Sequence, residues 1–372
     1  QYACDLTENE EESSMKNIVD AAAFYKAMTA LMEVPSKSSI EVLREIKAEF
    51  TGDQCVLSAT DLNTWMSVTL PASGDSFGFV FRNSANIQKI CRHYDGALEL
   101  ELQQRGDESF LTMRSGSKGG EFPVYDTKDC PVWPKLEVKQ TYAANAAKLL
   151  ACVKQVKYAV GSRNVRPEYQ GVLFQNKHIW AVEGHRAGCC DDGGLDVEPS
   201  FIVGVPELEQ LKAFGNADIQ ISVADNWVLF QNEHVRLLAK RILNVTPMTY
   251  ESVVPQKWNE EFCFHRKDFV QALKYLLACM EKNEKPYVRF HNGNLSLHAN
   301  GCLCKAEVPI STESSIVIGF DARFMLDALT PFEKQETVTM RLTGSLGAIL
   351  LIAGNSSAIV LPIRLREEQK AA

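Results

Sequence analysis

The sequence predicts an α+β fold made of three tandem copies of one domain, each with two helices packed on an antiparallel sheet. A β run leads into a short amphipathic helix three times, at residues 78–94, 201–214 and 316–329. The copies lie about 120 residues apart, which is longer than the repeat of a solenoid and indicates tandem domains. Each copy follows a longer helix and a set of strands with alternating apolar residues.

A longer amphipathic helix opens each repeat. Apolar residues recur at a spacing of three and four, which places them on one buried helix face. The three stripes consist of Ala21, Phe24, Met28 and Leu31; of Leu149, Val153, Val156 and Val160; and of Phe269, Leu273, Leu276 and Met280. We therefore expect each helix to pack on the sheet of its own repeat.

Apolar residues that alternate with polar ones predict the strands, and prolines predict the domain boundaries. Apolar residues alternate with polar ones at residues 98–102, 219–223 and 338–342, which predicts half-buried strands. Prolines within 131–134 and at Pro255 are expected to stop the strands before them. The expected domains are residues 15–136, 137–256 and 257–372, after an acidic extension at 1–14 that we expect to be disordered.

Composition narrows the class of protein. The chain has 372 residues, of which 45% are hydrophobic and 23% charged, as in a globular protein, and no apolar run is long enough to cross a bilayer. Eleven cysteines, an odd number, stand mostly in apolar surroundings, which suits reduced thiols in the cytoplasm. The pairs Cys189–Cys190 and Cys302–Cys304 lack the spacing of a structural zinc motif. We expect no metal site and no cofactor.

The distribution of charge leaves two interpretations open. The net charge of −8 argues against a surface that binds nucleic acid everywhere. Residues 142–160 nevertheless contain three lysines and no acid, and residues 82–94 contain no acid either. In the third repeat, residues 266–274 contain three basic residues, Arg266, Lys267 and Lys274, and one acidic residue, Asp268. These are either ordinary solvated helix faces or a basic face that each repeat turns toward one polyanion.

Signs of catalysis are weak. The glycine-rich residues 116–120 are flanked by alternating residues and followed by no helix, which favours a hairpin loop over a phosphate cradle. Glu183 and His185 leave open a hydrolase or metal enzyme as a minor hypothesis. We expect no catalytic residue.

The end of the chain is unusually apolar. Residues 358–365 form a strand pattern that contains Pro362, so this segment should be an edge strand or should leave the sheet after Leu361. Leaving the sheet would expose Leu361, Ile363 and Leu365 beside a groove. A plain terminal strand is the alternative.

Four motifs in this order resemble the bacterial DNA polymerase III β subunit, the sliding clamp, over residues 15–365. They are the segment from Tyr158-Ala159-Val160 to Gly171-Val172-Leu173-Phe174, the turn Glu183-Gly184-His185-Arg186, the segment Gly319-Phe320 with Leu326-Asp327-Ala328-Leu329, and the ending Val360-Leu361-Pro362-Ile363-Arg364-Leu365. Glu183 stands where the family has aspartate.

The resemblance implies a head-to-tail homodimer that closes a ring of six similar domains around duplex DNA. Such a protein is a processivity factor without catalysis of its own. It tethers the DNA polymerase III catalytic subunit, the clamp loader and other proteins that carry a clamp-binding motif. A second hypothesis is an adaptor that keeps the fold and the peptide pocket but closes no ring on DNA.

The resemblance also implies site residues. The pocket for a partner peptide would use Tyr169, Val182, Gly184, His185, Arg186, Ala187, Pro247, Val253, Asp321, Phe324, Leu346, Ile359, Val360, Leu361, Pro362, Ile363, Arg364 and Leu365. Ala187 replaces a leucine of the family and Tyr169 a smaller apolar residue, so the pocket's shape departs from the family's.

Two further groups of residues are expected. Basic residues facing DNA would be Lys37, Arg82, Lys89, Arg92, Lys148, Lys154, Lys157, Arg163, Arg166, Lys212, Arg266 and Lys267. The contact between subunits would join Phe122 and Val124 of one chain to Cys279 and Met280 of the other.

Overall fold

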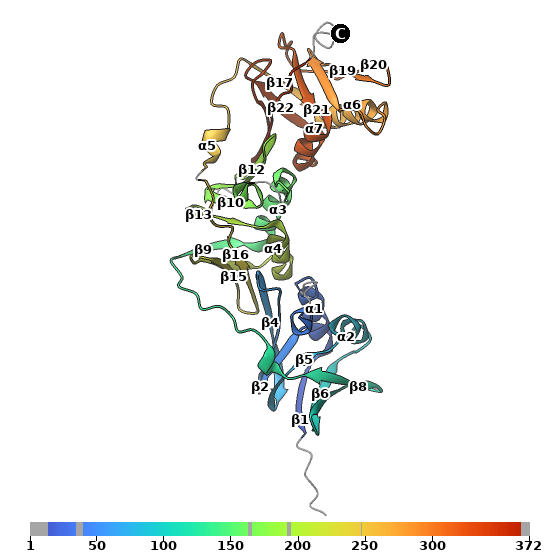
Figure 1. Ribbon diagram of the computed structural model, residues 1–372, viewed down its shortest axis with the longest axis vertical. Helices are drawn as coiled ribbons and strands as arrows, with labels where there is room; N and C mark the ends of the chain where they lie inside the picture. The colour runs from blue at the N-terminus through green and yellow to red at the C-terminus, as the bar shows by residue number, and fades with distance from the viewer. Residues whose placement is uncertain (1–13, 35–39, 163–165, 192–194, 247, 366–372) are drawn as a thin grey trace, which may run out of the picture. The chain divides into compact units, whose positions relative to one another are not determined.

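The computed structural model describes residues 14–34, 40–162, 166–191, 195–246 and 248–365 (Figure 1). The chain divides into two compact units, whose described parts fall within residues 1–141 and 213–240 for unit 1 and within 142–212 and 241–372 for unit 2. Strand β9 (Gln140–Asn145) and the 3₁₀ helix η5 (Gln210–Phe214) lie where the chain passes between the units.

Unit 1 is built around one antiparallel sheet with the strand order β1-β6-β7-β8-β5-β2-β3-β4-β16-β15-β14. Its strands are β1 (Met15–Asp20), β2 (Lys47–Thr51), β3 (Gln54–Thr60), β4 (Thr64–Gly74), β5 (Ser76–Phe81), β6 (Ala97–Arg105), β7 (Glu108–Ser115), β8 (Lys118–Tyr125), β14 (Asp218–Val223), β15 (Trp227–Gln231) and β16 (Val235–Lys240). Its helices are α1 (Ala21–Leu31), η1 (Glu41–Arg44), α2 (Ser84–Cys91) and η2 (Thr127–Asp129).

Unit 2 holds two antiparallel sheets, with the strand orders β13-β10-β11-β12-β24-β23-β22-β17 and β20-β19-β18-β21. Its strands are β10 (Val172–Asn176), β11 (His178–Val182), β12 (Arg186–Asp191), β13 (Val197–Val203), β17 (Glu260–His265), β18 (Tyr287–His291), β19 (Asn294–Ala299), β20 (Cys302–Glu307), β21 (Ile318–Asp321), β22 (Thr337–Leu342), β23 (Ile349–Ala353) and β24 (Ser356–Val360). Its helices are α3 (Ala146–Val156), η3 (Lys157–Ala159), η4 (Pro167–Tyr169), α4 (Val205–Glu209), α5 (Tyr250–Val253), α6 (Arg266–Ala278), α7 (Ala322–Leu329) and η6 (Thr330–Phe332).

The predicted α+β class with antiparallel sheets is confirmed, and the strand–helix repeat is visible in the element order. The longer helices α1, α3 and α6 directly follow the strands β1, β9 and β17. The shorter helices α2, α4 and α7 follow β5, β13 and β21. Side-chain caps start several of them: Asp20 accepts a hydrogen bond from Ala23 N at 2.8 Å, and Asn83 accepts one from Asn86 N at 3.0 Å. The domain boundaries predicted from the sequence stay a prediction.

The helix stripes form the core as predicted, except at their ends. Phe24 in α1 and Phe269 in α6 are fully buried. Met280, however, lies beyond the end of α6 and is only half-buried. The helix stops because the Cys279 amide donates back to Leu276 O and Leu277 O, which closes the last turn. Val160 likewise lies past α3 and is half-buried.

No helix among the described residues is long and apolar enough to span a membrane.

Candidate functional site

The turn between β11 and β12 forms the rim of a surface in unit 2. Glu183 and Arg186 close the turn, because the Glu183 amide donates to Arg186 O at 2.9 Å. A Cβ atom placed on Gly184 would meet nothing within 4 Å, so the turn faces open space. His185 is exposed beside it. The turn therefore presents His185 to solvent, while Glu183 and Arg186 are largely covered.

Arg186 connects this turn to helix α7 through an ion pair and a contact with an aromatic ring. Its Nε donates to Glu183 Oε1 at 2.7 Å, and its Nη1 forms an ion pair with Asp327. The guanidinium also lies 4.7 Å from the centre of the Phe324 ring, and that ring stacks on His185 at 5.6 Å between centroids. The Arg186 side chain is only 14% exposed. This arrangement fixes the direction of both Arg186 and His185.

The last described residues, up to Leu365, begin beside the same turn. Strand β24 pairs with β12, with Ala187 opposite Ile359. The Leu361 amide still donates to His185 O at 2.9 Å, but the Ile363 amide donates to Gly319 O of β21 at 2.8 Å. The chain thus leaves the eight-stranded sheet after Leu361 and bridges to the four-stranded one, as one sequence hypothesis expects. Strand β24 itself is interior, because β12 and β23 flank it.

One part of the predicted pocket is an apolar cluster on the eight-stranded sheet. The structure brings Tyr169, Val182, Ala187, Val253 and Ile359 into this cluster, which also contains the buried Trp180 and Tyr250. Val182, Ala187 and Ile359 are 6%, 1% and 2% exposed, so they support the surface from below. The half-buried members offer the contact area, and they are Tyr169, Ile242, Val245, Met248, Val253, Val254, Ala348 and Ile352.

A second part, here called the C-terminal hollow, lies where the chain crosses between the sheets. Its volume is about 500 Å³, and it is lined by Val317, Ser345, Leu346, Ile363, Arg364 and Leu365. Leu346 is 62% exposed. Leu361, two residues before Ile363 in the sequence, is 43% exposed. Apolar side chains this exposed are typical of a binding surface when they gather at one place.

The remaining pocket residues have supporting roles or lie outside the described residues. The Asp321 carboxylate caps α7 by accepting from Arg323 N at 2.8 Å and Phe324 N at 3.3 Å. Val360 is fully buried and Pro362 half-buried. Pro247 lies outside the described residues.

Sequence reasoning missed two residues of this surface. The Tyr158 hydroxyl donates to Ala187 O at 2.9 Å, and its ring lies against Gly188, where a Cβ would be 2.8 Å from the hydroxyl oxygen. Burial raises the pKa of Tyr158, so the hydroxyl keeps its proton and can donate. Asp327 is the second missed residue. Both stand in motifs that carry the family resemblance, which was the signal available.

The minor hypothesis of catalysis by Glu183 and His185 gains no support from their contacts. Glu183 accepts from Arg186, and His185 stacks on Phe324. Both interactions hold the turn in place.

Ten of the twelve predicted DNA-facing residues lie in the described part of the chain. Three have structural partners: Arg82 lies over the Tyr125 ring at 4.7 Å, Lys157 pairs with Glu209 at 2.9 Å, and Arg266 Nε donates to Leu329 O at 2.8 Å. Exposed residues without an ion pair in the described part of the chain are Lys89, Arg92, Lys148, Lys154, Arg166 and Lys267. Lys212 is also exposed, whereas Lys37 and Arg163 lie outside the described residues.

The predicted subunit contacts differ in how much side chain they can offer. Val124 is 1% exposed, so it faces the core of its own unit, while Phe122 on the same strand is half-buried. Cys279 and Met280 are half-buried at the end of α6, next to Tyr275, which is 54% exposed. This pairing stays a prediction.

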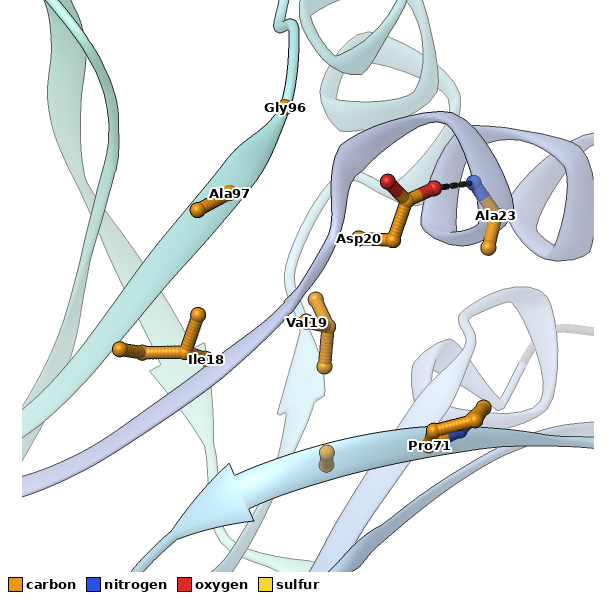
Figure 2. A pocket seen from close by; sticks show the side chains of 8 residues that line it. Ile18, Val19, Asp20, Ala23, Pro71, Gly96 and Ala97 are labelled. Atoms are coloured by element: carbon orange, nitrogen blue, oxygen red, sulfur yellow. Dashed lines mark hydrogen bonds between the residues drawn. The ribbon is translucent and has the colours of Figure 1, made fainter.

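Figure 2 shows a hollow in unit 1 at the junction of β1 and α1. It has a volume of about 670 Å³ and is lined by Ile18, Val19, Asp20, Ala23, Pro71, Ala72, Gly96 and Ala97. The Asp20 carboxylate, drawn with a dashed line in Figure 2, accepts from Ala23 N and so caps α1. The hollow therefore offers mainly apolar contact.

Known proteins similar to this chain are sliding clamps. It is 22% identical over 351 residues to the beta sliding clamp of Chlamydia muridarum, covering 90% of this chain and 94% of that protein. It is 23% identical over 366 residues to the beta sliding clamp of Bacillus subtilis, covering 90% and 95%. No family model matches the chain.

Solved structures agree. The DNA polymerase III subunit beta of Pseudomonas aeruginosa superposes with a TM-score of 0.83 at 18% identity, covering 94% of this chain and all of that one. The DNA polymerase sliding clamp of Bacillus subtilis gives a TM-score of 0.83 at 18% identity, covering 95% and 100%. The chain has the sliding-clamp fold over nearly its whole length, and the resemblance seen in the sequence is confirmed.

Proposed function

We propose that this chain is a sliding-clamp processivity factor, which encircles duplex DNA and tethers the replicative polymerase. The observation that carries the proposal is the clamp fold along at least 94% of the chain, matching the whole length of the solved clamps. Because one fold can serve several functions, the surface residues have to support the same conclusion.

The surface in unit 2 supports the binding of a short partner peptide. Its apolar cluster includes Val182 and Ala187, which flank the turn, and its C-terminal hollow is lined by Ile363, two residues after Leu361, whose amide bonds His185 of the turn. Two apolar anchors of a peptide, such as a leucine and an aromatic residue, would fill the two parts. The Arg186 and His185 side chains between them would orient the peptide backbone. The DNA polymerase III catalytic subunit, the clamp loader and other clamp-binding proteins are the proposed partners.

The exposed lysines and arginines support contact with DNA phosphates. Lys148 and Lys154 project from α3, whose residues include no acid, and Lys89 projects from α2 in the same way. Contacts to phosphates carry no sequence information, so they would let the protein slide. The acidic net charge would discourage DNA from binding elsewhere on the surface.

Two sheet edges support closure of a ring by a homodimer. Among the described residues, β8 pairs with β7 along its length but with β5 only at Val124 and Tyr125, so residues 118–123 leave one edge unpaired. Strand β20 is the edge of the four-stranded sheet and contains Leu303, which is 38% exposed. We propose that β8 of one chain meets β20 and the end of α6 of another, because unpaired edges readily pair.

In this proposal the protein supplies no chemistry of its own, needs no cofactor and works in the cytoplasm. The second candidate, an adaptor with the same pocket, differs only in failing to close a ring. Its motivation is Val124, whose burial removes one predicted side chain from the subunit contact.

Molecular mass and shape separate the two candidates. Sedimentation analysis should give the mass of two chains at micromolar concentration, and negative-stain images should show rings with a central hole. A monomer, or a dimer without a hole, would favour the adaptor.

A further inference from the structure

A second cluster of polar side chains lies in unit 2, at the end of the β11–β12 hairpin away from the turn. His178 of β11 stands directly opposite Asp191 of β12, and Cys189 lies two residues before Asp191. Since side chains alternate along a strand, all three project from one face of the sheet. The separation of His178 from Cys189 in the sequence matches no short zinc motif, so the sequence analysis expected no metal here.

The three potential ligand atoms lie at distances close to those around a tetrahedral ion. Cys189 Sγ is 3.4 Å from Asp191 Oδ1 and 3.7 Å from His178 Nδ1, and the latter two atoms are 2.6 Å apart. With bonds of about 2.0–2.3 Å, ligand atoms on a tetrahedral zinc ion lie about 3.3–3.6 Å from one another. Only the His178–Asp191 separation has to widen, by about 0.7 Å, when an ion replaces their hydrogen bond.

A fourth residue holds the imidazole in the form that a metal needs. Glu251 of α5 accepts at 3.1 Å from His178 Nε2, on the far side of the ring from Cys189 and Asp191. While Nε2 keeps its proton against Glu251, loss of the Nδ1 proton that bonds Asp191 leaves a lone pair directed toward the other two ligands. Metal-binding histidines commonly donate their second N–H to a carboxylate in this way. The Tyr250 ring, 4.8 Å from the imidazole between centroids, further restricts its rotation.

We propose that His178 Nδ1, Cys189 Sγ and Asp191 Oδ1 bind one zinc ion, with water as the fourth ligand. Thiolate, imidazole and carboxylate together favour zinc over magnesium or calcium, which prefer oxygen ligands alone. Binding replaces the proton of the Cys189 thiol and the proton in the hydrogen bond between His178 Nδ1 and Asp191, and both are released to solvent. His178 and Asp191 are 21% and 55% exposed, so an ion can enter from solvent, while Cys189 is 2% exposed at the base. The ion would hold together the start of β11 and the end of β12, at the end of the hairpin away from the turn that carries His185 and Arg186.

The test is a zinc titration of the full-length, metal-free protein against a chromophoric chelator, with cobalt(II) as a spectroscopic probe. The wild type should bind one zinc ion per chain, and its cobalt form should show a thiolate-to-metal charge-transfer band in the near ultraviolet. Asp191→Asn should lose most of this affinity and, because Asp191 is exposed, should remain folded. Glu251→Gln should keep the stoichiometry but weaken zinc binding by about 10–100-fold.

Cys189→Ser should abolish the charge-transfer band, whereas Cys302→Ser, which removes an exposed thiol elsewhere, should leave it unchanged. The proposal is overturned if the wild type binds no zinc at micromolar concentration. It is equally overturned if Asp191→Asn binds zinc as the wild type does.

Discussion

Arg186 is the side chain on which the candidate peptide surface depends most. It joins the β11–β12 turn to α7 through Glu183, Asp327 and the Phe324 ring. Glu183 is 18% exposed, so loss of its partner would leave a poorly solvated carboxylate. The residue therefore contributes both to the stability of unit 2 and to the shape of the surface.

Replacing Arg186 with Ala should lower the free energy of unfolding by about 2 kcal/mol. The charged hydrogen bond would be lost, and the Glu183 carboxylate would be left poorly solvated without its partner. The substitution should also weaken binding of a clamp-binding peptide at least tenfold. Arg323→Ala, on the exposed side of α7, is the matched control and should change neither quantity. Chemical denaturation and calorimetric titration measure the two effects. Unchanged peptide affinity in Arg186→Ala would mean that the peptide binds elsewhere.

Glu260 makes stability depend on pH. Burial by itself raises the pKa of this carboxyl, but hydrogen bonds from Ser314, Ser315 and Ile316 outweigh it and lower the pKa overall. Ser315 N and Oγ donate to Oε1 at 3.0 and 2.6 Å. Since the folded pKa lies below the unfolded value of about 4.3, the unfolded chain takes up the proton first. The stabilisation is complete above that value and is lost as pH falls through the folded pKa.

Glu260→Gln should therefore melt at a lower temperature than the wild type at neutral pH. The difference should begin to shrink as the pH falls below the unfolded pKa of about 4.3, and should vanish once the pH lies below the folded pKa, where the wild-type carboxyl is protonated. Thermal melts over this range measure it, with Glu313→Gln, an exposed acid nearby, as the control. A melting difference that stays constant with pH would show that the charge of Glu260 is irrelevant.

At the scale of elements, the contact of β21 with residues 363–365 shapes the C-terminal hollow. A Cβ atom on Gly319 would lie 2.6 Å from Leu365 Cδ2 and 3.0 Å from Ile363 Cγ1. Both side chains line the hollow, and the contacting atoms belong to flexible side chains rather than to backbone. A methyl group at Gly319 would thus meet these two side chains first, although the Gly319 backbone is itself paired with Arg289 of β18.

Gly319→Ala should reduce peptide affinity several-fold while changing the melting temperature little. Removal of residues 363–372 should go further and abolish binding with the fold retained. Fluorescence anisotropy with a labelled peptide compares these variants with Gly354→Ala, a glycine distant in the sequence whose turn requires a positive φ. If the truncated protein bound peptide with wild-type affinity, the C-terminal hollow would have no part in recognition.

Local sequence patterns predict helices and strands well but contacts between distant elements poorly. The spacing of Phe269, Leu273 and Leu276 was enough to predict the buried face of α6. The end of that helix was missed, because it is set by backbone bonds from Cys279 rather than by apolar spacing. Arg186 and Asp327 are 141 residues apart, and no local pattern links them. The pocket residues came from the family resemblance, and the His178 cluster from the structure alone.

At the scale of the whole molecule, closure of the ring requires a subunit contact that tolerates no buried charge. Met280→Glu should shift the protein from dimer to monomer at micromolar concentration, since an unpaired charge in an interface costs several kcal/mol. Lys282→Glu, two residues along and exposed, is the control. Sedimentation velocity measures the change. A dimer that survives Met280→Glu would place the interface elsewhere.

Retention on DNA tests encirclement most directly. Clamp loaded onto a nicked circular plasmid by a matching loader should stay bound in salt that removes ordinary electrostatic binding, because a closed ring is held by topology and not by phosphate contacts. One double-strand cut should then release it. Replacing Lys148 and Lys154 with Ala should slow loading but leave retention on circles intact. Equal release from circular and linear DNA would contradict the central claim that this chain forms a sliding clamp.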